Sequence, residues 1–211
     1  VPLSIRSFAI GAGMGFLLSA FIVLIISMTG GGNFNFQFER FSDYLRYMIP
    51  LIVFLLIAAL GEEWIFRGYP LSRLSQAVKP GWANVLVSLV FMAGHWGGSG
   101  WNVLSATNIF LFSMLLGALR FTRGGIPLAW GFHFTWNSFY VMTGTALSGE
   151  KFTVPFIDFI YTGPVWLSGG LYGPEGSIIA SFALMIAIIS IQRYLKFRPL
   201  NEEIENKRLS L

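Results

Sequence analysis

Long apolar stretches alternate with short charged segments along the whole chain. A helix needs about 20 apolar residues to cross the hydrocarbon core of a bilayer. The pattern therefore predicts an all-α fold: one polytopic membrane bundle of about six transmembrane helices, with no internal repeat and no second domain. The predicted spans are residues 10–28, 47–74, 82–97, 103–119, 126–142 and 177–192.

The first predicted span has the position of a signal peptide, because it follows Arg6 near the start of the chain. Its apolar run is long, however, and the three glycines at 30–32 do not form a typical small-x-small cleavage site. We therefore expect this segment to be retained as a helix.

Lysine and arginine are distributed unevenly over the connections between the spans. With the N-terminus in the cytoplasm, eleven of them lie on the cytoplasmic side and three on the outer side. Because cytoplasmic connections are enriched in these residues, both termini are predicted to be cytoplasmic. The eleven are Arg6, Arg67, Arg73, Lys79, Arg120, Arg123, Arg193, Lys196, Arg198, Lys207 and Arg208, and the three are Arg40, Arg46 and Lys151.

Two segments fall outside the predicted spans. The connection 143–176 is rich in glycine, proline and aromatic residues, which favours an aromatic belt at the outer membrane interface, with a re-entrant piece as the alternative. Residues 201–211 are polar and are predicted to form a cytoplasmic tail. The transmembrane domain is accordingly expected to cover residues 1–200.

Composition supports the membrane interpretation. Hydrophobic residues make up 55% of the 211 positions and charged residues 11%, which is less than half the roughly 25% of soluble domains. A net charge of +4 built from so few charges gives no basic face, so a nucleic-acid binder is excluded along with a soluble or disordered protein. The absence of cysteine excludes disulfides, thiolate nucleophiles and cysteine-ligated metals.

Ionisable side chains inside a span are costly and are therefore candidates for a functional site. Glu62, Glu63 and Arg67 follow the uncharged run 47–61. Glu63 and Arg67 are four residues apart, so they share a helical face and can pair. Glu62 lies about 100° further around the helix and is free to face another group.

The two histidines of the chain lie in two other predicted spans. His95 is near the end of the third span, and His133 is in the fifth, with Asn137 one helical turn later. Counted from the predicted cytoplasmic helix ends, Glu62, His95 and His133 lie about 15 to 17 Å deep. Similar depth on three helices predicts one buried polar site.

Other interpretations of these residues remain open. The Glu63–Arg67 pair can serve as a packing clamp, and two histidines on separate helices can ligate haem. Glu62, Glu63, His95 and His133 also carry the donor types that zinc prefers, although no HExxH pattern is present.

The order EExxxR, FxxxH and HxxxN, each in its own apolar segment, resembles the CPBP family of CAAX proteases and bacteriocin-processing enzymes. The matching residues are Glu62, Glu63 and Arg67, then Phe91 and His95, then His133 and Asn137. The sequence GPEG at 173–176 is also similar to a loop found before the last helix in bacterial members.

The resemblance implies an intramembrane endopeptidase of a prokaryotic cell membrane. It assigns activation of the attacking water to Glu62 and His95, stabilisation of the oxyanion to His133 and Asn137, and supporting roles to Glu63 and Arg67. The expected partners are membrane lipid and a membrane-associated peptide, such as a prenylated CAAX tail or a leader peptide.

On this interpretation no cofactor is needed. The alternatives are a zinc-dependent protease, with Glu62, His95 and His133 as the metal ligands, and a catalytically inactive immunity or scaffold protein. A transporter is disfavoured because such proteins usually carry inverted repeats, which the sequence lacks.

Overall fold

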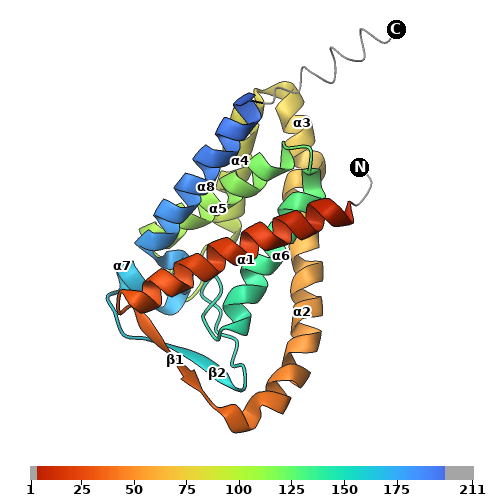
Figure 1. The fold of residues 1–211 in the computed structure, drawn as a ribbon. Coiled ribbons are helices and arrows are strands. Elements are labelled where there is room, and N and C mark those ends of the chain that lie inside the picture. Colours follow the sequence, from red (N-terminus) through yellow and green to blue (C-terminus); the bar gives the residue numbers. More distant parts are fainter. Residues whose placement is uncertain (1–3, 198–211) are drawn as a thin grey trace.

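The computed structural model describes residues 4–197, so the predicted tail at 201–211 lies outside the described residues. The chain is mostly helical (Figure 1). Its main helices are α1 (Ile5–Met28), α2 (Phe41–Glu63), α3 (Tyr69–Ala77), α4 (Pro80–Gly94), α5 (Val103–Arg120), α6 (Gly125–Met142) and α8 (Ile178–Phe197). Shorter elements are β1 (Gly32–Phe36), η1 (Phe38–Arg40), η2 (Trp64–Gly68), β2 (Ile157–Tyr161), α7 (Val165–Ser168), η3 (Gly170–Tyr172) and η4 (Pro174–Gly176).

Four helical segments of the described chain are long and apolar enough to cross a membrane. They are Ile5–Met28, Phe38–Ala77, Val103–Arg120 and Ile178–Leu195. Helix α4 has only 15 residues, about 22 Å, against the roughly 30 Å of a hydrocarbon core. A helical membrane bundle thus agrees with the sequence analysis, whereas six spans and cytoplasmic termini stay predictions.

Helix α1 lies across α6, and the two backbones approach closely (Figure 1). Gly11 and Gly15 face backbone carbonyls of α6, and Gly131 faces the carbonyl of Phe8, so that a methyl group at any of the three would collide with the partner helix. Thr135 Oγ1 donates to the carbonyl of Ala12 at 2.7 Å. Small residues that admit such contacts are the usual means of helix association in lipid, where no hydrophobic effect drives it.

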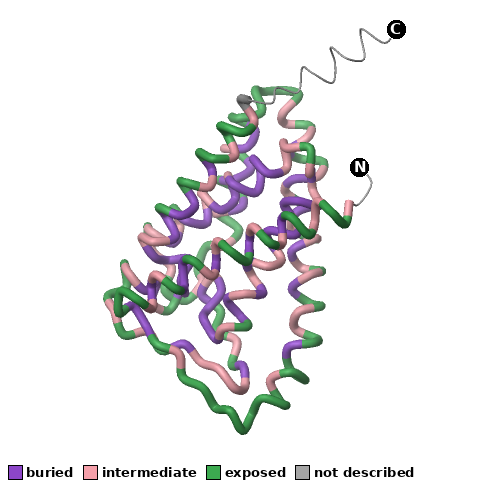
Figure 2. Tube along the Cα trace, viewed as in Figure 1, coloured by how far each residue is buried: buried purple, intermediate pink, exposed green. Residues whose placement is uncertain are grey.

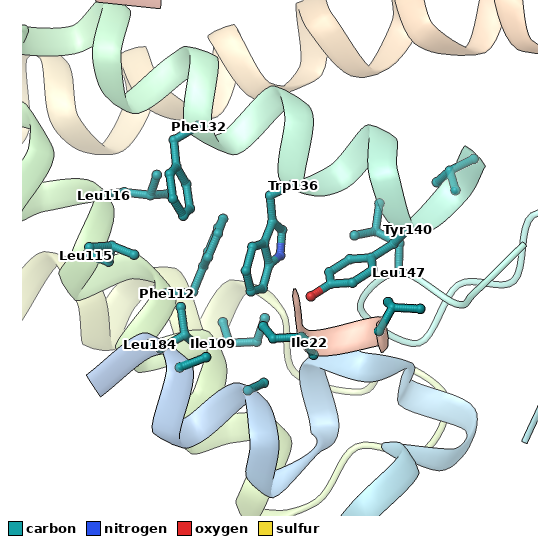
Figure 3. Close-up of a cluster of buried hydrophobic side chains, with 14 of the residues drawn as sticks. Ile22, Ile109, Phe112, Leu115, Leu116, Phe132, Trp136, Tyr140, Leu147 and Leu184 are labelled. Atoms are coloured by element: carbon teal, nitrogen blue, oxygen red, sulfur yellow. The ribbon is translucent and has the colours of Figure 1, made fainter. Parts of the chain in front are cut away.

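The core is a stack of aromatic rings between α5, α6 and α8 (Figure 3). Trp136 is fully buried, with ring centroids of Phe112 and Tyr140 at 5.0 and 5.1 Å. The outward faces of α2 and α8 are largely exposed (Figure 2), and their exposed residues are mainly apolar, as lipid-facing surfaces require.

A two-stranded antiparallel sheet is the element that the sequence analysis did not predict. Strands β1 and β2 pair from Gly32 opposite Tyr161 to Phe36 opposite Ile157. Each strand is only five residues long, and the pairing joins segments far apart in sequence. The sheet ties the end of α1 to the connection that follows α6 (Figure 1).

The connection 143–176 is structured rather than only an interfacial belt. Of the aromatic residues in this connection, Phe159 is 1% exposed and belongs to the core, whereas Trp166 is 59% exposed. Part of this connection folds back against α5 and α6, where its side chains close a cavity.

Candidate active site

The two glutamates stand where α2 changes its helical geometry. Glu63 is the last residue of α2, and Trp64–Gly68 forms a π-helical turn before α3 begins. The sequence analysis predicted one continuous helix over this stretch. A π-turn widens the helix by a residue and is often found at functional sites, because it redirects neighbouring side chains.

Glu63 is the acceptor at the centre of a buried network. Arg67 Nη1 donates to Glu63 Oε1 at 3.2 Å, so the pairing predicted from their spacing is formed. His133 Nδ1 lies 2.8 Å from the same oxygen. Because a carboxylate only accepts, Nδ1 carries the proton.

Arg67 is fully buried, and both terminal nitrogens of its guanidinium group donate hydrogen bonds. Its Nη2 donates to Ser113 Oγ at 2.6 Å, and its guanidinium carbon lies 4.4 Å from the centre of the Phe91 ring. Phe91 is the first residue of the FxxxH pattern, so this aromatic ring supports the buried cation. The compensated charge at Arg67 in turn lowers the cost of burying Glu63.

Glu62 lies on the other side of the same imidazole. Glu62 Oε2 is 3.9 Å from His133 Nε2, and the Glu62 side chain is 35% exposed. The imidazole of His133 therefore stands between two carboxylates, with Nδ1 towards Glu63 and Nε2 towards Glu62. The two neighbouring glutamates thus occupy different environments, one buried in a network and one open to a cavity.

His95 lies at the end of α4 and not within a helix that continues to residue 97. Helix α4 ends at Gly94, and His95 caps it with φ of −98° and ψ of 6°. His95 Nδ1 lies 2.9 Å from the carbonyl of Phe91, so Nδ1 carries the proton and Nε2 presents a lone pair. The Phe91 ring packs against the imidazole at 4.4 Å between ring centroids.

One cavity of about 220 Å³ unites the four residues predicted to do the chemistry. Glu62 reaches it from α2, His95 from the end of α4, and His133 and Asn137 from α6. Its other walls are mostly apolar: Phe54, Leu55 and Ala58 from α2, Phe91 from α4, and Ile109 and Phe112 from α5. A polar set in an apolar cavity of this kind is the usual form of a small-molecule or peptide site.

The comparisons with known proteins agree with the motifs. A family model described as "Type II CAAX prenyl endopeptidase Rce1-like" matches residues 44–139. This match confirms the resemblance to the CAAX-protease family. The matched residues contain all three motifs, and with them Glu62, His95, His133 and Asn137 of the cavity. The searches of curated proteins and of solved structures gave no match.

The match to this family model and the apolar helices together indicate an integral membrane peptidase that acts on a peptide substrate. The match begins within α2 and ends within α6. Helix α1, the connection 143–176 and α8 therefore lie outside the part that the family model describes.

The sequence analysis missed the cavity wall that comes from outside the matched stretch 44–139. Leu147, Ser148, Glu150 and Phe152 follow α6, and Glu175 precedes α8. Glu175 is 3% exposed, and its carboxylate accepts hydrogen bonds from Trp136 and Ser148. The only signal in the sequence was the GPEG loop, which was noted for its resemblance and not for its glutamate.

The zinc alternative was tested on the arrangement of donor groups. Within residues 4–197, no three His, Asp or Glu side chains are grouped as metal ligands are. His133 Nδ1 is committed to Glu63 and His95 Nδ1 to a carbonyl, which leaves Nε2 on each ring, as in histidines that bind zinc. The need for a metal stays a prediction, and the chemistry below is derived from the protein groups alone.

Proposed function

We propose that the protein is an intramembrane endopeptidase that hydrolyses a peptide bond of a membrane-associated peptide with a water molecule activated by Glu62. The observation that carries the proposal is the cavity, where Glu62, His95, His133 and Asn137 meet within one small volume. The family match gives independent support for peptidase chemistry. Water is the nucleophile on this proposal, because the chain has no cysteine and the hydroxyl of Ser148, the serine that lines the cavity, donates to Glu175 and not to a histidine.

The first step is attack on the carbonyl carbon. Glu62 accepts a proton from water, the water oxygen bonds to the carbonyl carbon, and the electron pair of the C=O double bond moves to the carbonyl oxygen. His95 Nε2, which presents a lone pair, accepts the second hydrogen bond of the water and orients it. An apolar cavity strengthens these interactions, because its effective dielectric constant is lower than that of water.

His133 and Asn137 are proposed to stabilise the resulting oxyanion. They are one turn apart on α6 and line the same cavity. Asn137 supplies an amide N–H, and His133 supplies Nε2–H in its doubly protonated form, since Nδ1 is already committed to Glu63. A preorganised donor of this kind lowers the barrier by about 3 kcal/mol.

The tetrahedral intermediate then collapses. The oxyanion re-forms the carbonyl group, the C–N bond breaks, and the amine leaves with the proton that Glu62 took from water. Glu63 and Arg67 act as positioning residues, because they hold His133 and do not line the cavity.

The experiment is cleavage by purified protein in lipid nanodiscs. Candidate substrates are a farnesylated CAAX peptide, the same peptide without the lipid, and a leader-type peptide. Glu62→Gln, His95→Ala and Asn137→Ala are each expected to lower kcat by at least about a hundredfold. Glu39→Gln and Asn35→Ala replace exposed residues of the same types outside the cavity and serve as matched controls.

Undiminished cleavage by folded Glu62→Gln would remove Glu62 from the mechanism. If the wild-type protein cleaves none of the peptides, and an unbiased profile of membrane peptides shows no difference between wild type and Glu62→Gln in cells, the inactive immunity or scaffold alternative replaces the protease.

A further inference from the structure

The structure assigns a positioning role to Glu175: its charge holds the Asn137 turn of α6 and the Ser148 wall of the cavity in their relative places. This inference rests on the proposed function, since Trp136, which Glu175 holds, directly precedes Asn137 of the proposed oxyanion hole. It concerns a residue outside the matched stretch 44–139.

The Glu175 carboxylate is a junction between two walls of the cavity. Oε1 accepts a hydrogen bond from Trp136 Nε1 at 2.8 Å, and Trp136 directly precedes Asn137 on α6. Oε2 accepts from the backbone N–H and the hydroxyl of Ser148, at 2.6 and 2.8 Å. A single carboxylate therefore fixes a helix and a loop that contribute different sides of the same cavity.

The charge of Glu175 is stabilised by neutral donors alone. In the part of the chain that the structure describes, no lysine, arginine or histidine forms an ion pair with it. Three hydrogen bonds from N–H and O–H groups satisfy an ionised carboxylate well, because bonds to a charged acceptor are about twice as strong as neutral ones. Nearby, burial raises the pKa of the Tyr172 hydroxyl and the charge of Glu175 raises it further, so this tyrosine stays neutral.

The backbone of Glu175 is anchored from the opposite side. Asn108 Nδ2 on α5 donates to the carbonyls of Glu175 and Ser177 at 2.7 and 2.8 Å. Ser181 Oγ on α8 donates to Asn108 Oδ1 at 2.6 Å. Because α5 and α8 hold the η4 turn, the carboxylate is a fixed point to which α6 and the loop are attached.

Trp136 and Ser148 differ in how far their positions depend on the bonds to Glu175. The Trp136 ring is already packed between Phe112 and Tyr140 (Figure 3). Ser148 has a φ of 49°, a left-handed conformation that is unfavourable for a residue with a side chain. The two bonds from Ser148 to Glu175 offset this strain, so the loop is the part that relaxes when the carboxylate is lost.

A glutamine at this position tests charge at constant volume. Its side-chain amide has one acceptor oxygen and one NH₂ donor, whereas the site presents N–H donors on both sides. Whichever way the amide turns, its NH₂ group faces either Trp136 Nε1–H or the Ser148 N–H. Glu175→Gln therefore breaks one half of the junction.

The experiment is a double-mutant cycle with Glu175→Gln and Trp136→Phe, measured as kcat and KM on a peptide that the wild type cleaves. Glu175→Gln is expected to lower kcat by about tenfold to a hundredfold, as a displacement of about 1 Å does, and to change KM by less than about threefold. Trp136→Phe removes the donor that opposes the amide. In that background, Glu175→Gln is expected to cost less than in the wild type.

Thr135→Val is the matched control for loss of stability. It removes a hydrogen bond from the neighbouring turn of α6 to α1, on the side away from the cavity. We expect it to lower the unfolding temperature and to leave kcat per folded molecule unchanged. Ser148→Ala removes one of the three bonds and is expected to lower kcat by less than Glu175→Gln. It takes the place of Glu175→Gln in the experiment if that variant does not fold.

Equal losses of kcat from Glu175→Gln with and without Trp136→Phe would overturn the inference, because a group acting directly on the substrate does not depend on Trp136. Unchanged kcat in folded Glu175→Gln would overturn it as well. Failure of the proposed function gives another result: the wild type and Glu62→Gln would then show the same cleavage, whatever the effect of Glu175→Gln.

Discussion

His133 donates its Nδ1–H to Glu63 at 2.8 Å, and Arg67 donates to the same oxygen of Glu63 from the other side. All three side chains are almost completely buried. Glu63 is thus the common acceptor that keeps one imidazole and one guanidinium in fixed places, and the orientation of His133 depends on a carboxylate outside the cavity.

This relationship predicts that replacing both Glu63 and Arg67 restores stability but does not restore activity. Glu63→Leu leaves Arg67 buried without its counter-charge, which costs about 3–5 kcal/mol. Adding Arg67→Met removes the unpaired charge, so most of the lost stability returns, whereas cleavage stays lost because His133 still lacks its acceptor. Thermal unfolding in detergent and peptide cleavage measure the two effects. Recovery of cleavage in the double variant would show that Glu63 does not position His133.

The crossing of α1 and α6 predicts opposite effects for two glycine substitutions. Gly131→Ala pushes a methyl group against the backbone of α1 and is expected to destabilise the protein by about 1–3 kcal/mol. Gly13 has no atom within 4 Å of an added Cβ, so Gly13→Ala is expected to be neutral or to stabilise α1 by up to about 1 kcal/mol. Unfolding temperatures of the two variants check this, and equal values would contradict the close crossing.

Metal removal is expected to leave cleavage intact. The proposed mechanism uses only protein groups, and the described residues do not gather a set of metal ligands. Activity should therefore survive dialysis against a strong chelator, with elemental analysis showing less than about one metal ion per ten proteins. Loss of activity that zinc restores would instead support the alternative in which Glu62, His95 and His133 bind the metal.

The absence of cysteine allows a direct test of orientation. Gln76 and Glu150 are both exposed, and the distribution of charge predicts the first on the cytoplasmic side and the second on the outer side. A single cysteine at position 150 should react with a membrane-impermeant maleimide in intact cells. A cysteine at position 76 should react only after the cells are opened, and the reverse pattern would invert the predicted topology.

Local spacing was sufficient to predict the parts of the site that lie within one helix. Glu63 and Arg67 pair because they are four residues apart, and His133 and Asn137 share a face for the same reason. Apolar length likewise predicted α1, α5 and α8 closely. These features follow from helical geometry and need no knowledge of the rest of the chain.

The parts that were not predicted depend on contacts between distant segments. The pairing of β1 with β2 and the bonds of Glu175 to Trp136 and Ser148 join residues that no local pattern connects. The π-turn after Glu63 and the end of α4 before His95 interrupt stretches that the apolar pattern shows as continuous. The GPEG sequence alone therefore does not reveal the role of Glu175, because its bonds are to residues distant in sequence.

The cavity draws its reactive groups from the stretch between α2 and α6 and one of its walls from the connection after α6. The proposed chemistry and part of the shape of the cavity therefore come from different segments of the chain. On the proposed mechanism, changes at Leu147 and Phe152 in this loop alter the shape offered to an incoming peptide, whereas the groups proposed to break its bond lie on other elements. Relatives with the same three motifs can in this way diverge in the peptides they accept while their chemistry stays the same.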